Sequence, residues 1–317
     1  VASQNKISID DYSISTNANF ILIFTNTKQI YRHSTESDVY LYNVKTKMLY
    51  RLPGNQNIRL AEISPDEQNV AIVKDNNLYI YNISTNTEKA ITTDGKRNYI
   101  IYGTTDWVNE EEFSFIKAFQ WSNDGKHLAY YRFDESNVKE FSLKYYNNDV
   151  YPEEYKYKYP KAGEDNAIID LFIYDIDDSN ITKLNLGEDR DIYIPRIKWL
   201  KNKNTLAVMR LNRLQNNLDI LLYSPQNANG NKVYNEQNKA YIEITDNWVM
   251  TNDGGWFYTS EKNGYNHIYY FNPSNNVDKQ ITNGSWDVKD ILGVDEKNMN
   301  IYYTSYEDGP MNIMCYV

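Results

Sequence analysis

Short strand-like segments recur along this chain of 317 residues, and they constrain its fold more than any other feature. One series is rich in β-branched and aromatic residues and follows polar turn-forming clusters such as Ser64-Pro65-Asp66-Glu67. Its members are residues 19–24, 69–74, 127–132, 205–210, 255–260 and 300–305. A second series lies at residues 38–42, 77–81, 170–174, 218–222 and 267–271, and short closing segments lie at 89–92, 182–184 and 279–282. Turn, strand, strand and edge strand at intervals of roughly 40–60 residues are typical of four-stranded propeller blades. The sequence therefore predicts an all-β propeller with about six visible blades, the last of them incomplete.

The two ends of the chain bear on how much of the protein it contains. A propeller must close its ring to hide its edge strands, so the strand-like residues 311–317 predict either a fragment of a longer protein or the completion of a final blade. Val1-Ala2-Ser3-Gln4 opens without a basic and apolar leader. We expect that any export signal has been removed or that the chain begins internally.

Composition argues against several classes of partner. The net charge of -10 and the pI near 4.9 argue against nucleic acid, whose phosphates need clustered Lys and Arg. The apolar runs are too short to span a membrane as a helix. The lone Cys315 excludes an internal disulfide framework and a Cys-based metal site.

The third blade carries an insertion at residues 98–119, which contains the segment Asp106-Trp107-Val108-Asn109-Glu110-Glu111-Glu112. Asp106 is a suitable N-cap for a short helix whose positive end favours the glutamates. Adjacent like charges repel, so the three glutamates are expected either to face water or to share a cation, such as a substrate ammonium. A solvated acidic helix end is the alternative interpretation.

A second insertion, residues 133–166, separates the middle strands of the same blade. Its alternating Tyr and Lys residues predict a two-stranded arm that projects from the ring. Such an arm is either a solvated hairpin or an oligomer contact, since exposed aromatic residues often anchor interfaces.

Catalytic and cofactor motifs are missing from the sequence. It contains no Gly-x-Ser-x-Gly, no His-Glu-x-x-His and no Gly-rich phosphate loop. His127 and His267 begin strands of the repeat, where packing roles are favoured, and His33 beside Arg32 is ambiguous. We therefore expect no catalytic residues, no metal and no cofactor in this chain, which is predicted to bind rather than to cut.

Several ordered motifs together resemble the propeller domain of the dipeptidyl peptidase IV family, in the prolyl oligopeptidase clan of serine peptidases. The strongest match runs from Thr105 to Phe113 through the glutamate run. The other matches are Lys28-Gln29-x-x-Arg32-His33-Ser34, Trp121-Ser122-x-x-Gly125-Lys126-x-Leu128-Ala129-Tyr130, Arg132-Phe133-Asp134-Glu135-Ser136-x-Val138, Tyr159-Pro160-Lys161-Ala162-Gly163 and Gly264-Tyr265-x-His267-Ile268-Tyr269. Asn109 departs from the tyrosine that relatives often carry there, a change expected to alter packing rather than charge.

The resemblance implies a fold and an activity. Residues 1–317 would be part of an eight-bladed propeller that caps an α/β-hydrolase domain, which bears the Ser-Asp-His triad and is absent from this chain. Glu111 and Glu112 would bind the substrate's free N-terminus, and Arg32 would contact a backbone carbonyl near that end. The parent would be an exported or periplasmic bacterial enzyme, with a cytoplasmic one still open, that releases Xaa-Pro or Xaa-Ala dipeptides. It would form a homodimer through the arm.

Two other interpretations stay open. The first is a non-catalytic propeller that binds a protein or peptide partner. The second is a related peptidase that releases products of a different length.

Overall fold

The computed structural model describes residues 7–54, 57–201 and 203–317, so Val1-Ala2-Ser3-Gln4 lies outside the described residues. The chain forms two compact units, Val1–Leu184 and Asn185–Val317. Nearly every element in both is a β-strand, and every strand pair is antiparallel. No helix within the described ranges is long and apolar enough to cross a membrane.

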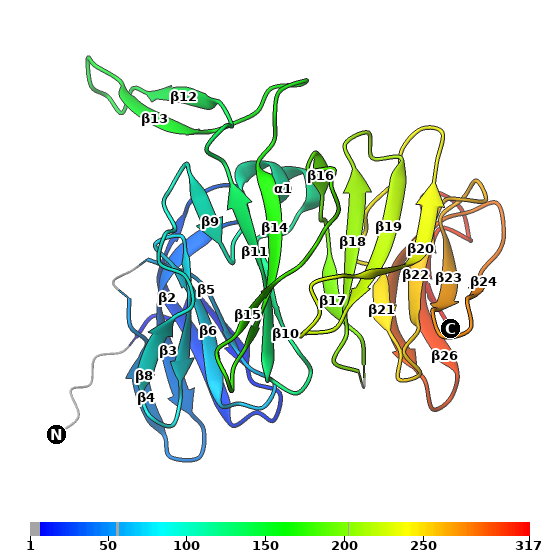
Figure 1. The fold of residues 1–317 in the computed structure, drawn as a ribbon, viewed down its shortest axis with the longest axis horizontal. Helices are drawn as coiled ribbons and strands as arrows, with labels where there is room; N and C mark the ends of the chain where they lie inside the picture. The colour runs from blue at the N-terminus through cyan, green and yellow to red at the C-terminus, as the bar shows by residue number, and fades with distance from the viewer. Residues whose placement is uncertain (1–6, 55–56, 202) are drawn as a thin grey trace. The chain divides into compact units, whose positions relative to one another are not determined.

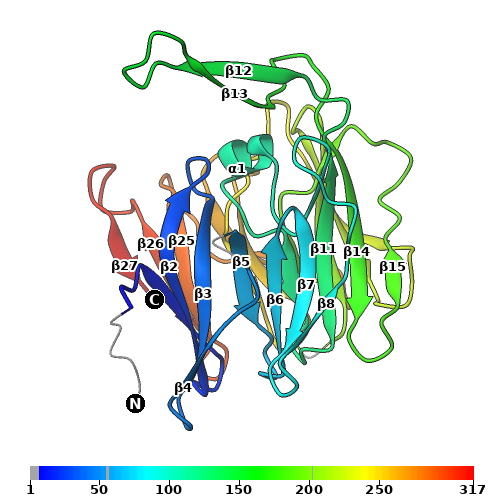
Figure 2. The same cartoon turned by 90° about the vertical axis from the view of Figure 1, so that its left-hand side faces the viewer.

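The first two blades of the first unit share one sheet, because β3 pairs both with β2 and, through Ser37 and Ile58, with β5 (Figure 2). The strands are β1 (Asp11–Ile14), β2 (Phe20–Gln29), β3 (Thr35–Asn43), β4 (Met48–Arg51), β5 (Ile58–Ile63), β6 (Asn69–Lys74), β7 (Asn77–Asn82) and β8 (Thr87–Ala90). Leu22, Val39 and Val70 pack in one fully buried cluster between the two blades. This packing of sheet against sheet removes apolar side chains from water and supplies most of the stabilisation.

The third blade carries both insertions. Its strands are β9 (Ile100–Tyr102), β10 (Phe119–Trp121), β11 (His127–Asp134), β14 (Ile168–Asp175) and β15 (Ile181–Lys183). Helix α1 (Trp107–Phe113) lies between β9 and β10, and the two-stranded sheet of β12 (Glu140–Tyr145) and β13 (Glu153–Lys158) lies between β11 and β14. Both views show this hairpin beyond the ends of the other strands of its unit, on the same side as α1 (Figures 1 and 2).

The second unit contains three further sheets. The first consists of β16 (Ile192–Tyr193), β17 (Ile197–Trp199), β18 (Leu206–Asn212), β19 (Asn217–Tyr223) and β20 (Asn231–Gln237). The second consists of β21 (Trp248–Met250), β22 (Trp256–Ser260), β23 (His267–Asn272) and β24 (Val277–Gln280). The third consists of β25 (Val288–Asp295), β26 (Asn300–Ser305) and β27 (Met314–Tyr316).

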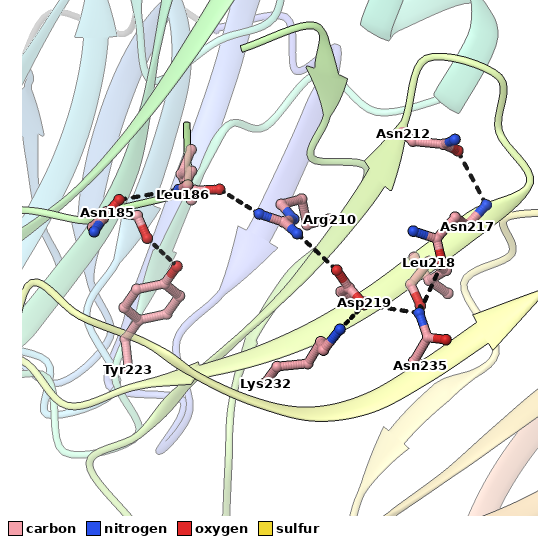
Figure 3. A network of polar contacts seen from close by, with 11 residues as sticks. Asn185, Leu186, Arg210, Asn212, Asn217, Leu218, Asp219, Tyr223, Lys232 and Asn235 are labelled. Carbon is pink, nitrogen blue, oxygen red and sulfur yellow. Dashed lines mark hydrogen bonds and ion pairs between the residues drawn. The ribbon is translucent and has the colours of Figure 1, made fainter. Parts of the chain in front are cut away.

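A buried carboxylate joins the strands of the first of these sheets (Figure 3). Asp219, 2% exposed, accepts from Arg210 Nη2 at 2.8 Å and from Asn235 Nδ2 at 2.8 Å, and it lies 3.4 Å from Lys232 Nζ. Arg210 also donates through Nη1 to the carbonyl of Leu186 at 2.7 Å. Because a buried charge is tolerated only when its partners surround it, this network fixes β18, β19 and β20 to the segment that precedes them.

The predicted fold class is confirmed: the chain is all-β and is built of propeller blades, six within the described residues, the sixth with three strands. The two predicted strand series correspond to the central strands of the blades, such as β6 and β7. The strand before each turn, such as β10 or β21, was not predicted. The predicted packing role of His267 is also confirmed, since it is 1% exposed and its ring nitrogens contact Thr282 Oγ1 and the carbonyl of Gly284.

Candidate functional site

Helix α1 begins at a capped turn of the acidic segment. Asp106 is extended (φ −73°, ψ 174°), and its Oδ1 accepts from the backbone N–H of Asn109 at 3.0 Å. Asn109 Nδ2 donates to the same oxygen at 2.8 Å, so the departure from tyrosine adds a second bond to the cap. Burial raises the pKa of Asp106, although both bonds favour its ionised form. The predicted N-cap is confirmed, and the buried Val108 and Phe113 anchor a helix that is too short to be stable alone.

Glu110 is buried and does not face water. Successive helical residues are about 100° apart, so the three glutamates enter different environments. Glu110 is 0% exposed, and its Oε1 accepts from the backbone N–H groups of His33 at 2.8 Å and Ser34 at 2.9 Å. The alternative of a solvated acidic helix end is therefore wrong for this residue. Two charge-assisted hydrogen bonds from the backbone stabilise its carboxylate, and its charge also interacts with that of Arg59. Glu110 thereby fixes the loop that carries Arg32.

Arg32 and Glu111 meet at the surface of the first unit. The Nε of Arg32 lies 2.8 Å from Oε2 of Glu111, with side chains 71% and 16% exposed respectively. Glu112 is the next residue of the same helix and is exposed. An ion pair with one highly exposed partner contributes only about 0–1 kcal/mol to stability. A ligand that offers both an ammonium and a carbonyl could therefore share these groups at little cost.

Aromatic side chains fix the base of the β12–β13 hairpin to the site. The rings of Trp107, on α1, and Tyr159, just after β13, have centroids 4.3 Å apart. The rings of Tyr31, next to Arg32, and the buried Tyr157 lie 6.0 Å apart. The hairpin thus packs against both elements that carry the charged groups. The alternating tyrosines were visible in the sequence, but nothing local indicates that Trp107 and Tyr31 are their partners.

The acidic side chains of this site do not gather into one group. Within the described ranges, no group of three or more His, Cys, Asp and Glu side chains is placed to hold a metal ion. Since Glu110, Glu111 and Glu112 enter separate environments, their carboxylates do not act as a single cluster.

Comparison with known proteins identifies the family. The family model for the dipeptidyl peptidase IV (DPP IV) N-terminal region matches residues 15–317. The chain belongs to the dipeptidyl peptidase IV family. Among its relatives, dipeptidyl aminopeptidase B of Saccharomyces cerevisiae is 34% identical over 318 residues, which cover 94% of this chain and 38% of the yeast protein. Dipeptidyl-aminopeptidase B of Aspergillus niger is 30% identical over 331 residues, which cover 93% of this chain and 36% of that protein.

A solved structure of the same family agrees. The crystal structure of Porphyromonas gingivalis dipeptidyl peptidase 4 matches with a TM-score of 0.93 and 38% sequence identity, covering 98% of this chain and 44% of that one. The chain therefore spans less than half the length of these relatives. It corresponds to the N-terminal region of a dipeptidyl peptidase IV family member, and the predicted resemblance is confirmed.

The buried bonds of Glu110 predict a large effect on stability. In Glu110→Ala the N–H groups of His33 and Ser34 lose their acceptor, and we expect the free energy of unfolding to fall by about 3 kcal/mol. Glu112→Ala is the matched control on the exposed side of the helix, with an expected change within about 0.5 kcal/mol. Urea unfolding followed by fluorescence measures both. Equal unfolding midpoints for the two variants would contradict the anchoring role of Glu110.

Proposed function

We propose that this chain is the substrate-recognition propeller of a bacterial serine dipeptidyl peptidase, which removes Xaa-Pro and Xaa-Ala dipeptides from peptide N-termini. Family membership supports the reaction class, and the match to the Porphyromonas gingivalis protein supports a bacterial source. The observation that carries the proposal is the contact of Arg32 with Glu111, with Glu112 next on the same capped helix.

In the proposed mechanism, two kinds of group bind the N-terminal end of the substrate. Glu111 and Glu112 bind the free ammonium through charge-assisted hydrogen bonds, and Arg32 donates to a nearby backbone carbonyl. Because α1 is capped at Asp106 and anchored through Glu110, it holds the ammonium at a fixed distance from the scissile bond. A peptide held at both points cannot rotate, which lowers the entropic cost of reaching the transition state. The propeller would thus place the scissile bond two residues from the N-terminus of the substrate.

Cleavage itself belongs to a part of the polypeptide outside this chain. The sequence holds no Gly-x-Ser-x-Gly, and the chain covers only 38–44% of its yeast relative and of the P. gingivalis structure. We propose that an α/β-hydrolase domain of the same polypeptide supplies the Ser-Asp-His triad and that residues 1–317 alone are inactive. We further propose an exported or periplasmic enzyme that acts on peptides with a free N-terminus.

A non-catalytic propeller is the second candidate. It would use the same charged surface to bind a peptide or protein partner without cutting it. It requires that no Gly-x-Ser-x-Gly follows in the downstream coding sequence, so that sequence separates the two candidates. The length of the released product distinguishes a dipeptidyl peptidase from a related peptidase that releases products of a different length.

Neutralising the glutamate pair tests the main proposal. In the full-length polypeptide, Glu111→Gln/Glu112→Gln should lower kcat/KM on Xaa-Pro amides by at least about 100-fold, since loss of the ammonium contacts removes about 3 kcal/mol of transition-state binding. Asp177→Asn/Asp178→Asn removes two adjacent charges from an exposed turn after β14 and should leave kcat/KM unchanged. Wild-type kinetics in the glutamate variant would refute the assignment.

The projecting arm allows a second test, which concerns the oligomeric state of the protein. We propose that the exposed aromatic residues of the β12–β13 hairpin and its turn, which include Tyr146 at 63% and Tyr151 at 85% exposure, form a homodimer contact. Replacing residues 140–158 by a short Gly-Ser turn should convert a dimer to a monomer in sedimentation velocity. The point variant Tyr146→Ser/Tyr151→Ser keeps the hairpin and should weaken the dimer. Unchanged sedimentation in both variants would place the contact elsewhere.

A further inference from the structure

The loop that carries Arg32 is short and closed at its base. It comprises residues 30–34 and connects β2 to β3, and the last ladder position of β2 before the loop is Gln29. The backbone N–H of Ile30 donates to the carbonyl of Ser34 at 2.8 Å, which closes the loop on itself. Inside this closure the backbone lies outside the β2–β3 ladder, so other groups must bond its polar atoms.

Gln29 supplies hydrogen-bond donors to this loop. Its Nε2 donates to the carbonyl of Tyr31 at 2.6 Å and to the carbonyl of Arg32 at 2.7 Å. Because both partners are acceptors, only the amide nitrogen can satisfy them, and this determines which way the side-chain amide of Gln29 is turned. The amide group carries two N–H bonds, one for each of these backbone oxygens.

The peptide unit between Arg32 and His33 is therefore bonded at both ends. Its carbonyl oxygen accepts from Gln29 Nε2, and its N–H donates to Glu110 Oε1 at 2.8 Å. A peptide unit is planar and rigid, so bonds at its two ends fix its orientation. Gln29 also holds the carbonyl of Tyr31, which belongs to the peptide unit before Arg32. With both flanking units held, the direction in which the Arg32 side chain leaves the backbone is fixed.

Arg32 needs this support from its backbone. Its side chain is 71% exposed, and an ion pair so open to water, here with Glu111, does little to hold it. An arginine side chain has many rotamers, and a fixed backbone limits the positions that its guanidinium reaches. A displacement of about 1 Å at a substrate contact can lower a rate by about 100-fold. The orientation of the backbone at Arg32 therefore matters more for binding than for stability.

We propose that Gln29 is a positioning residue for substrate recognition, which acts by holding the two peptide units on either side of Arg32. The inference rests on the proposed function, in which Arg32 donates to a backbone carbonyl of the substrate. Gln29 acts through Arg32 and forms no bond to the substrate itself. The rival is a purely structural role, in which Gln29 supports the turn without affecting what Arg32 does.

Kinetics of the full-length polypeptide on Xaa-Pro amides test the proposal. Gln29→Met keeps an unbranched side chain of similar length but removes both donors, so it should lower kcat/KM about tenfold. In an Arg32→Ala background the same replacement should change kcat/KM by less than about twofold, because the residue through which Gln29 acts is gone. Gln68→Met is the matched control and should keep wild-type kinetics. Gln68 is also exposed, and its Nε2 donates to a backbone carbonyl, that of Asp66, at 3.2 Å.

Hydrogen–deuterium exchange of the full-length protein gives a second readout, which does not need activity. Without the donors of Gln29, the peptide unit after Arg32 keeps only its bond to Glu110. The N–H groups of His33 and Ser34 should therefore exchange at least about threefold faster in Gln29→Met than in the wild type. Gln68→Met should leave their exchange unchanged.

The two readouts separate failure of this inference from failure of the proposed function. Unchanged kcat/KM in Gln29→Met, with a loss in the glutamate double variant, would keep the proposed function and overturn the role of Gln29. A tenfold loss that persists in the Arg32→Ala background would establish the purely structural role. If the wild type cleaves no Xaa-Pro amide, the proposed function fails and exchange decides. Unchanged exchange at His33 and Ser34 would then overturn the inference, whereas faster exchange would keep Gln29 as the residue that positions Arg32.

Discussion

The candidate site depends on one carboxylate and two backbone N–H groups. Glu110 Oε1 accepts from His33 and Ser34, which lie 77 and 76 residues away in the sequence. This contact joins the helix that carries Glu111 and Glu112 to the loop that carries Arg32. Without it, neither the helix of seven residues nor the exposed arginine would have a fixed position relative to the other. The three glutamates of this helix therefore differ in role. Glu110 is a buried anchor, whereas Glu111 and Glu112 lie at the surface.

The rest of the first unit supports this arrangement. The blades provide rigid strand ends, the Asp106 cap sets where α1 begins, and the aromatic contacts of Trp107 and Tyr31 attach the hairpin to the same elements. The hairpin carries the proposed dimer contact and packs on the rings beside the proposed ammonium clamp, so movement of the hairpin would reach the clamp through direct packing.

The central strands and part of the candidate site could be predicted from the sequence, for identifiable reasons. Central strands such as β6 and β7 each show a run of four consecutive apolar or aromatic residues, whereas β10 and β21 have only three residues each and give no comparable signal. The Asp106 cap follows a local rule, so it was found. Nothing local separates Glu110 from its two neighbours, because its partners are backbone groups of a distant loop.

In the proposed function, the propeller recognises a free N-terminal ammonium. This recognition can be measured as chromophore release from Xaa-Pro amides by the full-length protein, with free and N-acetylated substrates compared at equal concentration. Acetylation removes the positive charge and leaves the scissile bond unchanged, so we expect cleavage of the free substrate alone. Equal cleavage of both substrates would leave a peptidase without an ammonium clamp and would contradict the role of Glu111 and Glu112.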